Sequence, residues 1–293
     1  RGLFWLMSTS WPIYAAIVLG TNIVGAVAIM TFVVYFLPMP EIREFTTNFD
    51  NLFALGFTFV IFAVIVGVAA TILLFRPVWD WQRNPDDHDP NMVRNLVMRI
   101  PIYQAAVAAL VWLVGIGIAV ATTSASDGRL GLVVAVSSVL AGMVVVLITY
   151  LQAERMVRPV AAIALARRFE DSTLEPPIKL RLYLSWIMST GVPLLGIVLV
   201  FLAQVGGYFT QDANAILPAV IALTLTALGT GAMATAYSTM SVVDPIYELQ
   251  DAINRVRRGE RHVEVDIYDG SELGVLQAGF NEMMRGLHER QRL

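Results

Sequence analysis

The sequence predicts an all-α membrane protein, in which a six-helix transmembrane bundle built from three similar hairpins is followed by a cytoplasmic helix–connector–helix unit. Hydrophobic residues make up 57% of the 293 residues and charged residues only 15%, well below the roughly 25% of soluble domains. Six apolar stretches are each long enough to cross a bilayer, which takes about 20 residues. Residues 241–293, which we call the relay segment, instead carry apolar residues at helical spacing among charged ones.

The six apolar stretches define a transmembrane domain over residues 1–240. We place the spans near residues 11–37, 52–75, 101–123, 130–152, 182–208 and 215–240. None of these stretches contains Asp, Glu, Lys, Arg or His, the residues that mark ion and proton pathways within membranes. The sequence therefore argues against a pump, a proton-coupled transporter or a voltage sensor.

Lys and Arg are distributed unevenly between the two sides of the predicted bundle. Residues 76–99 and 153–181 hold most of the cations near the spans, whereas the opposite side holds Arg43 and Arg129 only. Because cytoplasmic loops carry the excess of Lys and Arg, we expect a multi-pass protein of the plasma membrane with both termini in the cytoplasm.

The loops on the opposite side are short. They cover residues 38–51, 124–129 and 206–214, and none is long enough to fold around a core of its own. Any sensed ligand must therefore meet the membrane bundle itself, and we expect membrane lipids to be its partners. Nothing in the sequence indicates binding of nucleic acid.

Similar short sequence motifs recur in the three predicted hairpins. A proline lies near the start of the first helix of each hairpin: Pro12, Pro101 and Pro193. The second helices end in related tripeptides, namely Arg76-Pro77-Val78, Arg158-Pro159-Val160 and Asp244-Pro245-Ile246. We infer three copies of one ancestral hairpin arranged about a pseudo-axis, of which only the last retains its relay.

The relay segment contains two amphipathic helical patterns joined by a connector. Their apolar residues are spaced three and four apart, which buries a narrow seam as in a small parallel bundle. The connector alternates apolar and polar residues. Each helix would leave an apolar stripe exposed, so two copies of the chain are needed to close the bundle. The predicted relay core comprises Ile246, Leu249, Ile253, Val256, Val263, Val265, Leu273, Leu276 and Leu287.

Several motifs of the relay segment resemble a HAMP domain, and the likeness covers about a fifth of the chain. Pro245 opens the first helix, Gly259-Glu260 follows it, and Asp269-Gly270-Ser271-Glu272-Leu273-Gly274 begins the second. The resemblance assigns signal transfer to Pro245, Gly259, Glu272, Phe280, Asn281 and Met283. It implies a homodimer, and we expect Glu272 to cap the second helix and tie it to the first.

Six spans without an outer domain, followed directly by a HAMP unit, resemble the membrane-anchored class III adenylyl cyclases of actinobacteria. The resemblance implies that a C-terminal output domain makes cyclic AMP from ATP with Mg or Mn and contributes to the homodimer. We expect that domain to lie outside these residues, which would then be part of a longer protein. Residues 1–293 contain no catalytic, cofactor-binding or metal-binding motif.

The sequence leaves two other functions open. The chain could be the membrane and HAMP part of a sensor histidine kinase or chemoreceptor, although these usually have two spans around an outer domain. It could also be a purely structural anchor that dimerises its output domain and senses nothing.

Overall fold

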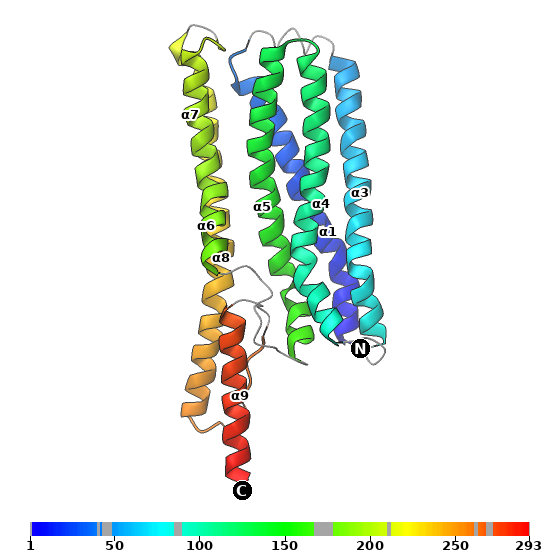
Figure 1. Ribbon diagram of the computed structural model, residues 1–293, viewed down its shortest axis with the longest axis vertical. Helices are drawn as coiled ribbons and strands as arrows, with labels where there is room; N and C mark the ends of the chain where they lie inside the picture. Colours follow the sequence, from blue (N-terminus) through cyan, green and yellow to red (C-terminus); the bar gives the residue numbers. More distant parts are fainter. Residues whose placement is uncertain are drawn as a thin grey trace.

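The computed structural model describes residues 2–39, 42, 49–84, 90–166, 178–209, 212–260, 263–267 and 272–292. These residues form helices, turns and one extended connector, and no strand occurs among them. The helices run up and down along one long axis, and α9 extends beyond the other helices at one end (Figure 1). The predicted all-α fold with six apolar helices is confirmed.

The first two hairpins form one group of four long helices. Their bounds are α1, Gly2–Thr31, continued by the π-helical turn η1, Phe32–Phe36; α3, Phe49–Arg83; α4, Pro90–Ser124; and α5, Gly128–Ala166. α4 packs along α5, while α1 contacts both α3 and α5.

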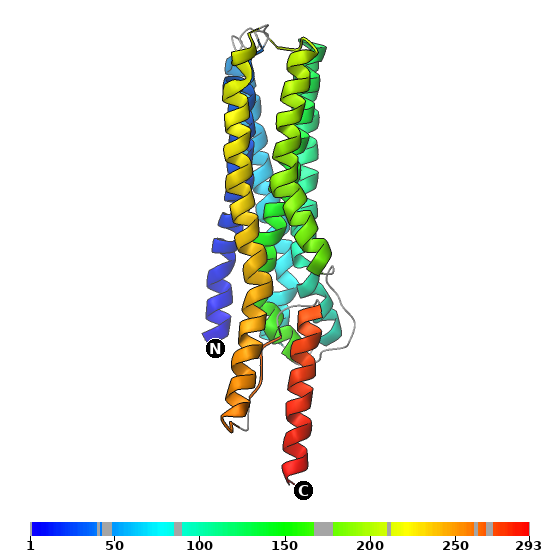
Figure 2. The ribbon, with the colours of Figure 1, turned by 90° about the vertical axis from the view of Figure 1, so that its left-hand side faces the viewer.

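The third hairpin lies beside this group and leads into the relay segment (Figure 2). Its ascending helix has three parts: α6, Ile178–Trp186; the π-helical turn η3, Ile187–Gly191; and α7, Val192–Val205. The 3-10 turn η4, Ala213–Ile216, precedes α8, Leu217–Arg257, and α9 spans Glu272–Arg292.

Six helical segments are long and apolar enough to cross a membrane. They are Pro12–Phe36, Phe57–Trp81, Asn95–Ser124, Gly128–Val157, Ile178–Val205 and Asn214–Arg257. Each contains most of one predicted span, and several continue past it on the side of the relay segment. Charged residues therefore lie at the ends of these helices.

α8 is a single helix that includes both the last span and the first helix of the relay segment. The expectation that Pro245 opens a separate helix is wrong, because Pro245 lies inside α8 and is fully buried. A proline inside a helix removes one N–H bond to the carbonyl four residues earlier, and its ring clashes with that carbonyl. Here the helical backbone nevertheless continues on both sides of Pro245.

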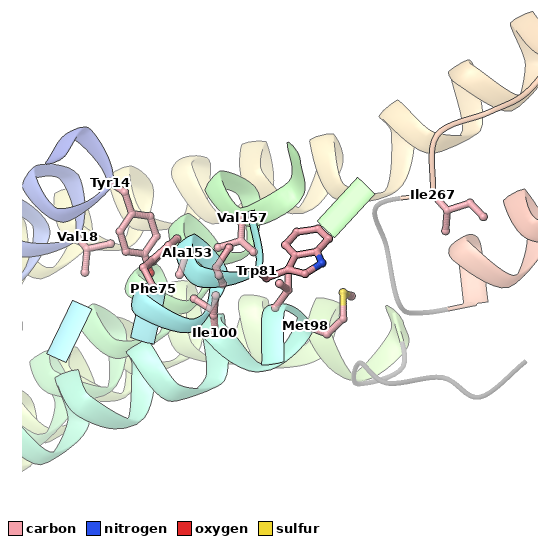
Figure 3. Packing of buried hydrophobic residues seen from close by; sticks show 11 residues of the cluster. Tyr14, Val18, Phe75, Trp81, Met98, Ile100, Ala153, Val157 and Ile267 are labelled. Carbon is pink, nitrogen blue, oxygen red and sulfur yellow. The ribbon is translucent and has the colours of Figure 1, made fainter. Parts of the chain in front are cut away.

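A buried cluster closes the relay-side end of the four-helix group. Figure 3 shows Tyr14, Phe75, Trp81 and Ile100 packed together from three different helices. The cluster also includes Ile267 from the connector before α9, and Ala278 of α9 packs against it. The relay segment is therefore in contact with the base of the membrane bundle as well as with α8.

Polar side chains inside the bundle pair with one another between helices. Asn22 of α1 donates to the Thr149 hydroxyl of α5 at 3.1 Å and accepts from the indole N–H of Trp112 of α4 at 3.0 Å. In an apolar medium, a buried polar group without a partner is costly, so these bonds help fix how the three helices pack.

Candidate functional site

The relay segment folds as two parallel helices joined by an extended connector. The lower half of α8 and all of α9 point in the same direction, away from the bundle (Figures 1 and 2). α8 ends at Arg257, and Gly259, two residues later, has a φ of +92°, which lies in the left-handed region. Glycine adopts this region without steric cost, and its N–H bonds the Val256 carbonyl at 2.9 Å.

A small apolar core holds the two helices and the connector together. Its buried members come from all three parts: Ala252, Val263, Val265, Phe280 and Met284, with Leu249 and Val256 partly buried around them. The connector contributes alternate residues because successive side chains of an extended chain point to opposite sides. Glu264 and Asp266, between its apolar residues, are exposed.

The apolar residues of each relay helix, which are spaced as in heptads, divide into a buried set and an exposed set. On α8, Leu249 and Val256 face the core, whereas Ile246 and Ile253 are 47% and 45% exposed. On α9, Phe280 faces the core, whereas Leu276 and Met283 are both 54% exposed. Residues seven apart lie on one face of a helix, so each helix presents one apolar face to its neighbour and a second face outward.

Asn281 fastens the connector to α9. Its side-chain carbonyl accepts the Val265 N–H at 2.9 Å, and its amide donates to the Val265 carbonyl at 2.8 Å. An extended connector lacks the internal hydrogen bonds of a helix, and buried backbone groups need partners. One side chain thus satisfies both polar backbone groups of Val265.

Gln277 lies one turn before Phe280 and is 1% exposed. Neither its side-chain oxygen nor its nitrogen has a hydrogen-bond partner among the residues that the structure describes. Leaving such a group unpaired costs about 1–3 kcal/mol. The packing of α9 in the single chain therefore leaves the side-chain amide of Gln277 in an unfavourable environment.

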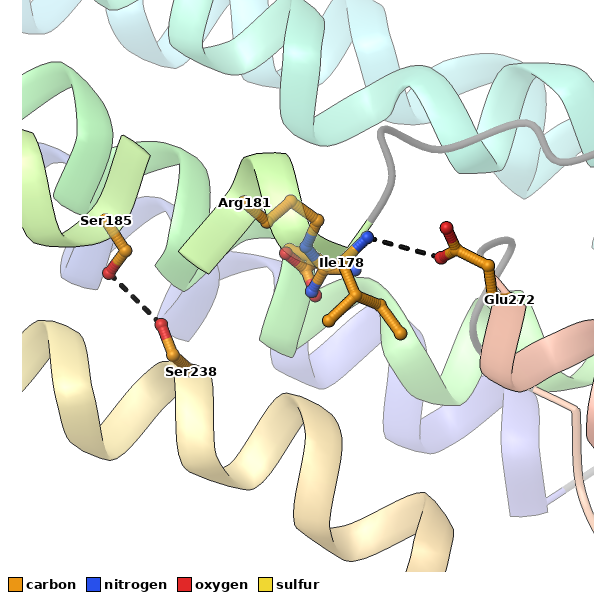
Figure 4. Close-up of polar contacts among 6 residues, drawn as sticks. Ile178, Arg181, Ser185, Ser238 and Glu272 are labelled. Carbon is orange, nitrogen blue, oxygen red and sulfur yellow. Dashed lines mark hydrogen bonds and ion pairs between the residues drawn. The ribbon is translucent and has the colours of Figure 1, made fainter. Parts of the chain in front are cut away.

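Glu272, at the first turn of α9, contacts the membrane bundle. Its Oε2 accepts the backbone N–H of Ile178 at 3.2 Å, at the start of α6 (Figure 4). The first N–H groups of a helix have no partner within it, and a carboxylate there is favoured by the helix dipole. The Glu272 carboxylate thus binds α6. The sequence predicts a contact with the first relay helix, which is part of α8.

The start of α6 is also held by a buried ion pair. Arg181 of α6 binds Glu154 of α5, and the two side chains are 7% and 9% exposed. An ion pair removed from water persists only with good geometry, and losing one partner leaves an uncompensated charge. α6 is therefore fixed to α5 within one turn of the residue that Glu272 contacts.

A row of small polar residues connects α6 and η3 to α8. The Ser238 hydroxyl donates to that of Ser185 at 3.1 Å (Figure 4). The Thr230 hydroxyl donates to the Ser189 carbonyl at 2.6 Å. Pro193 lacks the N–H that would bond the Ser189 carbonyl in an α-helix. The π-helical turn before Pro193 and the Thr230 hydroxyl satisfy the backbone at this interruption.

The structure places the predicted relay residues in three environments. The core contains Leu249, Val256, Val263, Val265 and Phe280, and Asn281 binds the connector. The outer faces carry Ile246, Ile253, Leu276, Met283 and Leu287, with Leu273 partly buried. The sequence reasoning missed Ala252, Gln277 and Met284, all buried. Their spacing on the inner face, at 277, 280 and 284, could have revealed the last two.

The described part of the chain offers no group of three or more His, Asp or Glu side chains that could hold a metal ion. Its interactions are those of packed helices and hydrogen-bonded helix ends. This arrangement can transmit a change of helix position.

Comparison with known proteins agrees with this architecture. Residues 237–289 match the HAMP domain family. The chain is 28% identical over 281 residues to the uncharacterized protein Rv1319c of Mycobacterium tuberculosis and, equally, to Mb1353c of Mycobacterium bovis. Rv1318c of M. tuberculosis is 32% identical over 152 residues, which are 52% of this chain and 28% of that protein. No solved structure matches significantly.

The alignments with Rv1319c and Mb1353c cover 94% of this chain and 51% of each relative. The chain thus spans about half the length of these curated relatives. Taken together, the six apolar helices and the family match show that the chain is a multi-pass membrane anchor with a HAMP signal-relay domain.

Proposed function

We propose that this chain is the membrane and HAMP part of an adenylate cyclase, which makes cyclic AMP from ATP through a C-terminal domain beyond residue 293. The observation that carries the proposal is the direct passage of α8 from the membrane bundle into the HAMP domain. The short outer turns leave the membrane helices as the input, and α9 points away from the bundle toward an output. The relatives' additional length leaves room for such a domain.

In this proposal both termini lie in the cytoplasm, and the C-terminal domain supplies the carboxylates that bind Mg or Mn. The role of the present residues is to set the position of α8 and α9. A switch of this kind needs two packings that differ by only a few kcal/mol. The side-chain amide of Gln277, which has no hydrogen-bond partner among the described residues, is consistent with a relay core of reduced stability in one of these two packings.

The active unit in this proposal is a homodimer joined through the relay segments. The outward faces of α8 and α9 carry Ile253 and Leu276, whose exposure as apolar side chains in a polar environment is unfavourable. Two copies placed side by side bury these faces in a parallel four-helix bundle. The exposed faces therefore favour self-association of this chain.

Cysteine cross-linking tests the dimer directly, because the chain contains no cysteine. In membranes, Ile253→Cys should form a disulfide-linked dimer on mild oxidation. Asp251→Cys is the matched control, since Asp251 is also exposed on α8 but points away from the outward apolar face. Equal cross-linking of both variants, or of neither, would contradict the proposed dimer.

The output is tested with membranes that contain the full-length protein. They should convert ATP to cyclic AMP in the presence of Mn²⁺ or Mg²⁺. Transfer of the γ-phosphate to a histidine instead would identify a sensor kinase. A soluble version without residues 1–240 that matched the intact protein in activity and stability would show that the membrane helices neither sense nor anchor.

A further inference from the structure

Three exposed cations, which we call the rim cations, lie near the relay-side end of the membrane bundle. They are Arg76 of α3, Arg99 of α4 and Lys179 of α6, each within the first or last six residues of its apolar segment. Among the residues that the structure describes, none of these three side chains has an ion pair or a hydrogen bond. Their charges are therefore available to a partner outside the chain.

Each rim cation continues a stripe of exposed apolar residues on its own helix. Residues three or four apart are neighbours on one face of a helix. The neighbours three residues away from the rim cations, toward the middle of the membrane, are Leu73, Ile102 and Leu182, all exposed. Long cationic side chains near the ends of membrane helices extend toward the interface. The rim cations thus reach the lipid where its acyl chains end.

Exposed tyrosines mark the level of the interface on two of these helices. Tyr103 follows Arg99 by four residues, and Tyr183 follows Lys179 by four residues; the two tyrosines are 39% and 68% exposed. Tyr and Trp are enriched at the level of the headgroups of a membrane. Four residues of helix span about 6 Å, so both cations lie within one turn of this level, on its relay side.

Arg76 lies at the same depth as Arg99. Thr71 of α3 donates to the Gln104 side chain of α4 at 3.4 Å, which sets the register of these two neighbouring helices. Arg76 and Arg99 each lie five residues, or about 7.5 Å, closer to the relay segment. Asp80, one turn beyond Arg76, is exposed but forms no ion pair with it. Two adjacent helices thus present one guanidinium each to the same layer of lipid.

Two other arginines near this end of the bundle contact the protein itself. Arg181 is buried in its ion pair with Glu154. Arg155 of α5 lies over the ring of Tyr237 at 6.0 Å and contacts the sulfur of Met240, and both partners belong to α8. Cations that join helices are therefore distinct from the rim cations, which face the membrane.

The rim cation on α6 lies next to the contact between the bundle and the relay segment. Lys179 directly follows Ile178, whose backbone N–H binds the Glu272 carboxylate of α9 at 3.2 Å (Figure 4). A molecule bound by Lys179 therefore lies beside the place where the relay segment is attached to α6.

We propose that the rim cations bind the phosphate groups of anionic phospholipids in the leaflet on the relay side. The charged group binds the phosphate, and the apolar stripe beside it contacts the acyl chains of the same lipid. A zwitterionic phospholipid carries a positive group next to its phosphate, which a guanidinium or ammonium group repels. A single Lys or Arg near a membrane surface favours anionic lipid by about fivefold. This binding does not depend on the identity of the output domain.

Photolabelling in phosphatidylcholine nanodiscs tests the proposal. One sample contains a small fraction of phosphatidylglycerol with a diazirine near the headgroup end of one acyl chain, and the other contains phosphatidylcholine with the same diazirine. We expect phosphatidylglycerol to label α3, α4 and α6 next to the rim cations about fivefold more than phosphatidylcholine does. Equal labelling by the two lipids would overturn the proposal.

Charge-neutralising variants test each position separately. Lys179→Gln should abolish the excess labelling on α6 and leave that on α3 and α4, whereas the double variant Arg76→Gln, Arg99→Gln should do the reverse. Lys179→Arg should keep the excess, because it keeps the charge. Arg155→Gln is the matched control, since it removes an exposed cation that α8 already contacts, and it should change none of the labelling. Equal losses in this control and in the rim variants would contradict the proposed sites.

Added inorganic phosphate distinguishes a lipid headgroup from a free anion. Loss of the excess labelling with phosphate, but not with sodium chloride of the same ionic strength, would overturn the assignment to a lipid. Substitutions at exposed positions usually change stability little, and melting temperatures in the same nanodiscs identify any variant that fails to fold. The rim cations on the other helices then decide the outcome.

Discussion

Asn281 and the Arg181–Glu154 pair show how single polar residues hold neighbouring segments of this protein together. Asn281 occupies both backbone groups of Val265 in an otherwise unsupported connector. Arg181 and Glu154 fix the start of α6 to α5 near the relay-side end of the bundle. In both cases, a partner that loses its bond stays partly or wholly buried, which makes these residues sensitive to substitution.

Replacing Asn281 with Ala should loosen the connector without unfolding the helices. The two backbone groups of Val265 would lose their partners, at a cost of about 1–3 kcal/mol. Hydrogen exchange of the Val265 amide should then become about 5-fold to 100-fold faster, since 1.4 kcal/mol corresponds to a factor of ten. Glu282→Ala, at the exposed neighbouring position, is the control, and an equal effect there would contradict the role of Asn281.

Removing one partner of the buried ion pair should destabilise the bundle far more than removing both partners. Arg181→Met or Glu154→Met alone should destabilise the bundle by about 3–5 kcal/mol, because a single buried charge is left without its counterion. The double variant should recover most of this loss. Thermal unfolding in nanodiscs gives the four values of the cycle, and additive losses would show that the two residues act independently.

At the scale of helices, the interior of the relay segment combines apolar packing with one unsatisfied amide. Gln277 occupies the same inner face of α9 as Phe280 and Met284. A polar residue in the seam of a bundle lowers stability, and in some bundles it specifies register. We expect it to keep the two packings of the relay close in free energy.

Replacing Gln277 with Leu should stabilise the relay segment and favour one packing. The apolar side chain removes the unsatisfied amide, a gain of about 1–3 kcal/mol. Slower hydrogen exchange in α9 would report the gain, and the full-length protein should lose most of its response to the input. Gln250→Leu, on the exposed surface of α8, controls for added apolar area. Faster exchange in Gln277→Leu would contradict the assignment.

The sequence was sufficient to predict the helices, the connector and their apolar spacing, because these follow from local periodicity. It was not sufficient to predict that α8 passes through Pro245 without a break, since packing decides whether a proline ends a helix. The spacing of Leu276 and Met283 indicates a seam but not which neighbour covers it. The contact between Glu272 and Ile178 joins residues 94 positions apart, and no local pattern reveals such a pair.

For the whole molecule, the relay segment is attached to the membrane bundle at more than one place. α8 attaches it covalently, and Glu272 and Ile267 attach it through contacts with α6 and with the base of the four-helix group. A change in the bundle therefore reaches α8 and α9 separately. We therefore expect the signal to depend on the distance of the relay segment from the bundle as well as on the rotation of α8.

Insertions into α8 between Met240 and Asp244 distinguish a signal carried by rotation of the relay segment from one that also depends on its distance from the bundle. One added alanine turns the relay by about 100°, whereas seven nearly restore its orientation but displace it by about 10 Å. Because the displacement separates Glu272 from Ile178, we expect both insertions to abolish regulation of the output of the full-length protein, measured as the proposed cyclic AMP synthesis. Recovery with seven residues would show that rotation of α8 alone carries the signal.

The hydrogen bond between Glu272 and Ile178 also has a consequence for the membrane side. Coupling free energy between two sites is reciprocal, so a state of the relay segment that strengthens this bond must also change the affinity of the bundle for any ligand that binds α6. Such a ligand, and one bound beyond the relay segment, would change each other's affinity by the same factor. The membrane helices would then respond to events beyond the relay segment as well as act on them.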